Sequence, residues 1–338
     1  MYLFIKKIIL FFIPFLVLFP LYIYLDPFKV IYGYDSYYPD SGISKIDVGK
    51  DFVSYENFIK NYPLYHYNSF VFGSSRSFFY RINKWSDYIN TPQSKCYHFD
   101  GFKESLYGIT NKIRYLNQSE VPIKNALVIL DFEVFQGKNR VDDYLRLQHP
   151  SISDENWIRF HYIHLKQFFS YTFLKKYFTD CFPCRFQESD NDQVDRIKLI
   201  VYNKVSNELI WKGLDDFITA DEEDYYQSRI SSFYDRPVTT QYSNKIIEHR
   251  HIAQLNEIKK VFERNQTSFR IVISPLYDQV KFNQSDLEVL QNLFGKENVF
   301  DFSGINSFTI PVTNYYEESH YRPQVADSIL KIIYSARQ

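Results

Sequence analysis

The chain has little cysteine, little glycine and no excess of charge. Its 338 residues include 3 cysteines and 10 glycines, and 39 basic side chains balance 40 acidic ones. An odd number of cysteines cannot all pair within one chain. No glycine-rich phosphate-binding loop is present, and we predict neither a cofactor nor a bound metal. Because phosphate binding needs an excess of lysine and arginine, the balanced charge argues against nucleic acid as a partner.

Aromatic residues are the abundant class instead, with 30 tyrosines and 32 phenylalanines. This composition indicates an ordered globular fold and excludes a disordered chain. Aromatic faces suit carbohydrate binding, although core filling or a biased coding composition explains them equally well. The length allows one large domain with insertions or two small ones.

The N-terminal 26 residues differ in kind from the rest. The segment Ile8–Leu25 contains 18 residues without a charge, close to the roughly 20 that cross a hydrocarbon core. Two lysines precede it and Asp26 follows, so we expect a cytoplasmic N-terminus and an exported remainder. A cleaved signal peptide is the alternative, but Leu21–Pro27 lacks the small residues of a cleavage site. We therefore predict an uncleaved single-pass membrane anchor over residues 1–26.

Strand and helix patterns alternate after a polar, tyrosine-rich lead-in over residues 27–66, which contains a short helix near Ser54–Asn61. The expected strands are Tyr67–Phe72, Lys95–Phe99, Asn125–Asp131, Ser268–Ser274 and Asn298–Phe302. The expected helices are Lys103–Asn117, Asn244–Arg264, Gln284–Phe294 and Pro323–Ala336. Strands separated by helices predict a parallel sheet in a three-layer α/β domain over residues 67–336.

A stretch over about residues 137–241 interrupts this alternation. It reads as a mainly helical insertion, placed either to shape a substrate site or to dock on a membrane partner. Within it, Cys181 and Cys184 have the spacing of a redox motif, but we favour a local staple or two free thiols over a redox protein. His161 and His164 stand three residues apart without a third ligand, which favours a helix face over a metal site.

Two short motifs carry the strongest chemical signal. In Val71–Ser77 (VFGSSRS), Ser75 stands just beyond a strand and a glycine turn, where a helix N-terminus offers N–H groups to an oxyanion. In Glu317–Tyr321 (EESHY), Glu317 can accept the Nδ1 proton of His320 and leave Nε2 facing Ser75. These are the nucleophile, base and orienting acid of a serine hydrolase or acyltransferase.

Each motif also has a structural reading. Gly-Ser-Ser is a frequent turn sequence, and only its place after a buried strand singles out Ser75. Arg76 could bind an anionic substrate group, but a solvated or helix-capping role is the commoner one. Asp131 could be an active-site residue or a cap at a loop entry.

With these motifs the chain resembles the SGNH (GDSL-type) hydrolase superfamily. The likeness is to its membrane-anchored bacterial branch, which includes alginate O-acetylation proteins and the D-alanyl-lipoteichoic acid biosynthesis protein. Gly73-Ser74-Ser75 stands where the family has Gly-Asp-Ser, and Glu317 to His320 where it has Asp-x-x-His. In the second block, Gly101 would share the oxyanion hole with the N–H of Ser75. The resemblance implies a three-layer flavodoxin-like fold.

The chain departs from the family pattern at three places. Ser74 and Glu317 each replace an aspartate, and the family's Gly-x-Asn-Asp block has no clear match, with Leu130–Glu133 standing roughly there. A missing oxyanion donor would cost on the order of 3–4 kcal/mol of transition-state stabilisation.

From these features we expect a membrane-anchored, extracytoplasmic serine esterase or O-acyltransferase. The resemblance implies a cell-envelope or exported polysaccharide as substrate and a membrane-bound O-acyltransferase as partner. The alternative is a catalytically inactive SGNH-like scaffold subunit of an envelope-assembly complex.

Overall fold

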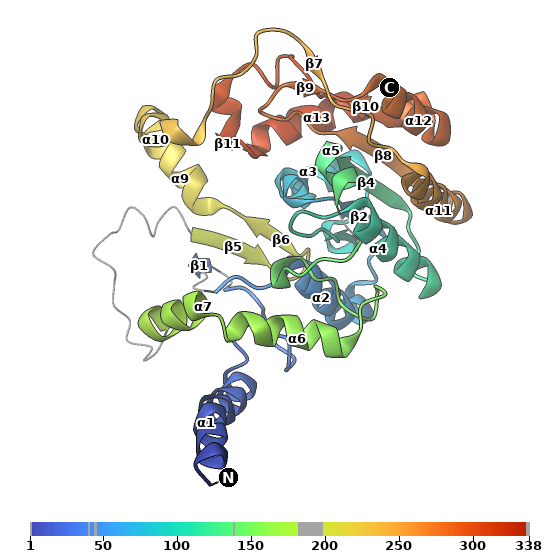
Figure 1. The fold of residues 1–338 in the computed structure, drawn as a ribbon. Coiled ribbons are helices and arrows are strands. Elements are labelled where there is room, and N and C mark those ends of the chain that lie inside the picture. Colours follow the sequence, from blue (N-terminus) through green and yellow to red (C-terminus); the bar gives the residue numbers. More distant parts are fainter. Residues whose placement is uncertain (1, 40, 44–45, 138, 182–198, 336–338) are drawn as a thin grey trace.

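A parallel five-stranded sheet forms the centre of the protein (Figure 1). Its order is β10-β8-β4-β2-β3, and all four pairings are parallel. The strands are β2 (Ser69–Phe72), β3 (Cys96–His98), β4 (Asn125–Leu130), β8 (Ser268–Ile273) and β10 (Val299–Asp301). Counted along the chain, the order is 2-1-3-4-5, so the winding direction reverses between β2 and β4. Ligand sites in such sheets lie at that reversal, beyond the carboxyl ends of the strands.

The structure is a computed structural model that describes residues 2–39, 41–43, 46–137, 139–181 and 199–335. Cys184 lies outside these residues, and with it the expected relation between Cys181 and Cys184. Cys96 is buried in β3 as a free thiol.

Helices cover both faces of the sheet. One face carries α2 (Lys50–Tyr65), α4 (Leu106–Gln118), α11 (His249–Asn265) and α12 (Gln284–Phe294). The other carries α3 (Ile82–Tyr88) and α13 (Pro323–Ser335). These three layers confirm the expected α/β architecture, and all five expected strands are present. Helix α2 is longer than expected, and it packs Phe58 into the core of the sheet, so the lead-in is part of the folded body.

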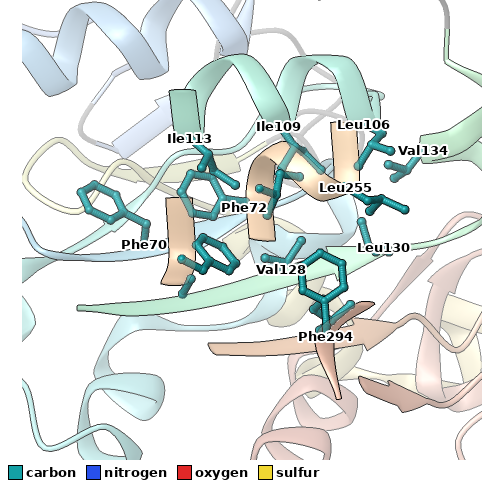
Figure 2. Close-up of a cluster of buried hydrophobic side chains, with 14 of the residues drawn as sticks. Phe70, Phe72, Leu106, Ile109, Ile113, Val128, Leu130, Val134, Leu255 and Phe294 are labelled. Carbon is teal, nitrogen blue, oxygen red and sulfur yellow. The ribbon is translucent and has the colours of Figure 1, made fainter. Parts of the chain in front are cut away.

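The strands are mostly apolar because both faces of the sheet are buried. Figure 2 shows the first face, where Phe72, Val128 and Leu130 of the strands meet Ile109 of α4 and Leu255 of α11. The alternate residues along the same strands point the opposite way and pack against α3 and α13; they are Val71, Leu127, Ile129 and Val272.

Helix α1 (Tyr2–Leu25) precedes the body. Among the helices that the structure describes, none combines the length and the apolar character that a membrane crossing requires. The anchor expected over residues 1–26 therefore has no structural support.

The insertion is less helical than expected. It contains α6 (Trp157–Phe168), α7 (Tyr171–Lys176), the π-helix η4 (Tyr177–Cys181), α9 (Lys212–Ala220) and α10 (Glu222–Ser228). It also contains an antiparallel hairpin of β5 (Leu199–Asn203) and β6 (Glu208–Ile210), which pairs with β1 (Ser41–Ile43) of the lead-in. Local patterns do not reveal this pairing because its partners are more than 150 residues apart.

Buried polar contacts hold the hairpin against the central sheet. Lys50 donates to the Asn207 carbonyl oxygen at 2.8 Å, and the Asn207 side chain donates to the His98 carbonyl oxygen at 2.6 Å. Asp100 accepts from His98 Nδ1 and pairs with Lys50 at 3.0 Å. Because Asn207 lies in the turn between β5 and β6, this network sets where the chain enters α9.

Short elements complete the fold. The remaining helices are η1 (Ser75–Phe79), η2 (Gln93–Lys95), α5 (Phe132–Gln136), η3 (Tyr144–Arg146), η5 (Ile230–Ser232), η6 (Lys296–Asn298) and η7 (Val312–Asn314). The remaining strands are β7 (Gln241–Tyr242), β9 (Val280–Lys281), β11 (Tyr315–Glu317) and β12 (His320–Tyr321).

Candidate active site

Ser75 is the first residue of η1, directly beyond the carboxyl end of β2. The turn between them depends on Gly73, whose φ is +155°. A Cβ atom at this position would lie 2.9 Å from the carbonyl oxygen of Ile129 in β4. Only glycine lets the chain pass so close to the neighbouring strand, and the turn then presents Ser75 at the reversal of winding.

His320 and Glu317 lie opposite each other in the β11–β12 hairpin. A two-residue turn, Glu318 and Ser319, joins the strands. The hairpin is anchored by its buried neighbours Tyr316 and Tyr321, which pack in the core below α13. The spacing of three residues in the sequence thus becomes a cross-strand contact.

The three side chains form a continuous hydrogen-bonded series. Ser75 Oγ lies 2.7 Å from His320 Nε2, although 245 residues separate them in the chain. On the other side of the ring, His320 Nδ1 contacts Glu317 Oε1. The second Glu317 oxygen accepts the backbone N–H of Ser319 at 2.7 Å. The structure therefore brings Ser75, His320 and Glu317 together in the arrangement of a catalytic triad.

The charge of Glu317 determines the tautomer of His320. Burial by itself would raise the pKa of Glu317, but the hydrogen bond and charge of His320 and the Ser319 N–H lower it below its usual value. An ionised carboxylate can only accept hydrogen bonds. The Nδ1 atom of His320, which contacts Glu317, therefore carries the hydrogen. The lone pair of Nε2 then faces the hydroxyl of Ser75, as a general base requires.

Arg76 fastens the two motifs to each other. Its Nη1 donates to Asp131 Oδ2 at 2.8 Å and to Glu133 Oε2 at 2.9 Å, and its Nε donates to the Ser319 carbonyl oxygen at 3.1 Å. In return, the Tyr321 hydroxyl donates to the Arg76 carbonyl oxygen at 3.1 Å. The residue next to the nucleophile thus holds the turn of the hairpin that carries the base.

This role differs from the solvated or capping Arg76 that the sequence suggested. The side chain is 7% exposed. Burial would lower its pKa, but Asp131 and Glu133 outweigh burial and raise that pKa above the usual arginine value. Its charge is balanced by these two carboxylates, which compete with any anionic substrate group for the guanidinium.

Asp131 caps a helix and also lies at the active-site edge of the sheet, the two roles that the sequence had left open. Its Oδ1 accepts the Val134 N–H at 3.0 Å and caps α5, while its Oδ2 pairs with Arg76. The residue follows β4, beside Ser75 across the reversal of winding. It therefore occupies the active-site edge of the sheet as a positioning residue.

Gly101 does not have the free N–H that an oxyanion donor needs. Its N–H donates to the Gly73 carbonyl oxygen at 3.2 Å, which ties the loop after β3 to the turn before Ser75. The N–H of Ser75 itself, at the first position of η1, has no acceptor within that helix. Of the two expected donors, Ser75 is thus the one that could serve a substrate.

Trp211 is a site residue that the sequence did not reveal. It lies between β6 and α9, and its ring meets the His320 ring edge to face at a centroid distance of 4.8 Å. Phe79 of η1 contacts the rings of both Trp211 and His320. The insertion therefore shapes one wall of the site, which no local motif signals because Trp211 and His320 are distant in sequence.

A pocket of about 360 Å³ opens beside the triad. Its lining includes Ser75, His320, Arg146 and Ser74. Ser74 Oγ is buried and has no hydrogen-bond partner within the described part of the chain.

A second pocket of about 430 Å³ shares Lys103, Glu104 and Arg146 with the first, so the two pockets lie side by side. Most residues that line the adjoining pocket are polar. Besides the three shared residues, they include Ser105, Asn139, Arg140, Gln148, Asp154 and Asn156.

No family model matches the chain, and no curated protein matches it. The resemblance to SGNH hydrolases therefore stays a prediction from the sequence motifs.

Proposed function

We propose that the protein is a serine acyl-ester hydrolase or O-acyltransferase of the SGNH type. The observation that carries this proposal is the pair of contacts that the His320 ring makes. Its Nε2 lies 2.7 Å from Ser75 Oγ, and its Nδ1 contacts the carboxylate of Glu317. A serine, a neutral histidine and an ionised carboxylate in this order make up an activated nucleophile.

The reaction follows from these positions. Ser75 Oγ attacks the ester carbonyl carbon as His320 Nε2 takes the hydroxyl proton, and Glu317 stabilises the resulting imidazolium. The N–H of Ser75 donates to the oxyanion. His320 then gives the proton to the departing alcohol, which leaves an acyl group on Ser75. Water or a sugar hydroxyl, deprotonated by His320, accepts this acyl group and restores the serine.

The finer fold assignment belongs to the same proposal. The strand order 2-1-3-4-5 supports a flavodoxin-like sheet, and the place of Ser75 after the first strand and of His320 before the last helix supports the SGNH type. The substrate in this proposal is a cell-envelope or exported polysaccharide. The mostly polar pocket beside the triad pocket suits a hydroxyl-rich substrate. An extracytoplasmic location and a membrane-bound O-acyltransferase partner are further parts of it.

Covalent labelling with a fluorophosphonate probe tests the proposal. The full chain is expected to be labelled, and Ser75→Ala and His320→Ala are expected to abolish labelling. Ser74→Ala is the matched control, because it removes the neighbouring hydroxyl and leaves the triad in place. Failure of the folded wild-type chain to react, or equal labelling of Ser75→Ala, would refute an activated Ser75.

One observation favours the alternative of an inactive scaffold subunit. The N–H of Gly101 is already donated to Gly73, so one of the two expected oxyanion donors is lost. Under this alternative the folded chain would not react with the probe, whereas it would retain a binding partner in the envelope. The labelling experiment therefore separates the two candidates.

A further inference from the structure

One helix pair far from the triad carries an unusual charge. The segment Trp157–Lys176, which contains α6 and α7, includes Arg159, Lys166, Lys175 and Lys176 but no aspartate or glutamate. The whole chain has a formal net charge of −1. Arg159 is paired with Glu155 and Asp142, so the outward charge of the segment comes from the exposed Lys166, Lys175 and Lys176, which favour an anionic partner.

The same helices expose large apolar and aromatic side chains. Ile158 is 80% exposed and Tyr171 is 79% exposed, and Trp157 and Tyr162 are exposed as well. The opposite side of the two helices is buried in a third hydrophobic cluster, through Phe160, Ile163, Phe168 and Phe173. Trp157 also packs on His149 and His161, whereas Ile158, Tyr162 and Tyr171 present large side chains to solvent, as residues at interaction sites do.

Helix α1 joins the body at the buried side of the same helix pair. The Tyr22 ring in the last turn of α1 lies 5.3 Å from the Phe168 ring, and Phe28 lies 4.8 Å from Phe173. Figure 1 shows α1 leaving the body on the side of α6 and α7. Leu16 and Tyr24 of α1 are also exposed.

We propose that the outward face of α6 and α7 lies on an anionic lipid surface. Tryptophan and tyrosine concentrate at the headgroup level of bilayers, where their apolar rings and polar edges are both satisfied. Lysines near the surface are attracted by anionic lipids. A protein partner could cover the aromatic residues, but the three exposed lysines and the exposed Leu16 and Tyr24 of the neighbouring α1 favour lipid.

This orientation also bears on the pockets near the triad. Residues Ser153–Asn156, which directly precede α6, line the 430 Å³ pocket that adjoins the pocket of Ser75. These pockets would then lie near the lipid surface, where a membrane-held acyl donor could reach them. This consequence rests on the proposed function, whereas the lipid contact does not.

Tryptophan fluorescence of the full chain tests the lipid contact. The chain has three tryptophans, of which Trp85 is buried and Trp211 is half-buried, so Trp157 is the exposed reporter. Vesicles contain equal amounts of phosphatidylcholine and phosphatidylglycerol, with a part of the phosphatidylcholine brominated near the headgroup. We expect quenching of the wild-type emission and loss of that quenching in Trp157→Phe.

The lysines provide a second arm. Replacing Lys166, Lys175 and Lys176 together by glutamine should reduce the quenching several-fold, and vesicles of phosphatidylcholine alone should quench less than anionic ones. A triple variant at exposed lysines elsewhere, Lys245, Lys260 and Lys296, is the matched control and should quench like the wild type. The proposal would be overturned if anionic vesicles did not quench Trp157, or if quenching persisted in Trp157→Phe. The outward face of α6 and α7 would then be expected to bind a protein partner. Fluorophosphonate labelling of the same samples reports on the triad independently.

Discussion

Replacing Arg76 by methionine should destabilise the protein severely. Methionine preserves much of the side-chain volume but removes the positive charge. Asp131, which is 1% exposed, would then be a buried carboxylate without its cation. Breaking a buried ion pair in this way costs about 3–5 kcal/mol. Since domains are typically stable by roughly 5–15 kcal/mol, the variant should lose a large part of its free energy of unfolding.

The structure also predicts how this loss can be recovered. In the double variant Arg76→Met/Asp131→Asn, no charge remains buried at Asp131, and the asparagine oxygen can still cap α5 through the Val134 N–H. Glu133 tolerates the loss because half of its side chain is exposed. The double variant should therefore be more stable than the single Arg76→Met variant.

Urea unfolding followed by circular dichroism measures these differences. A single-variant cost of less than about 1 kcal/mol, the size of an exposed ion pair, would refute the reasoning. A double variant no more stable than the single one would refute it as well. Arg76→Lys offers a functional readout, because a lysine keeps the charge but cannot hold both carboxylates and the Ser319 carbonyl oxygen. It should fold and react more slowly with the fluorophosphonate probe.

Three further predictions concern pH and the turn before the nucleophile. Because the folded state lowers the pKa of Glu317, the stability that Glu317 adds relative to Glu317→Gln should be complete above its usual pKa of about 4.3. That advantage should disappear as the pH falls through the lowered pKa, which urea titrations at a series of pH values would measure. Burial lowers the pKa of His164 to about 4. The unfolded chain therefore binds a proton at this residue at a higher pH than the folded chain does. As the pH falls from the usual histidine pKa of about 6.5 to about 4, the free energy of unfolding of the wild type should drop by roughly 3 kcal/mol relative to His164→Gln. Equal pH profiles for these two chains would contradict the buried neutral ring. Gly73→Ala should lose about 1–3 kcal/mol and its probe labelling, because the new methyl group meets the Ile129 carbonyl oxygen and φ is positive. Gly33→Ala, where nothing lies within 4 Å, is the control and should melt like the wild type.

The central layers could be predicted because their signals are local. The runs that became β2, β4 and β8 are apolar on both faces, and the spacing of apolar residues in α12 and α13 follows one turn of a helix. The boundaries were less certain: the long helix begins at His249 and not at Asn244. The β5–β6 hairpin was missed because its stabilising partners lie in the lead-in and in β3.

The sequence by itself determined which residues could do chemistry and roughly where the strands end. Ser75 after a buried strand and the spacing of Glu317 and His320 are readable without any coordinates, since each is a short-range pattern. Only the tertiary structure decided that Ser75 and His320 meet, that Arg76 is buried between Asp131, Glu133 and the Ser319 carbonyl oxygen, and that the Gly101 N–H is already donated. These contacts join segments 28 to 245 residues apart, and long-range packing, which local propensity does not encode, brings such segments together.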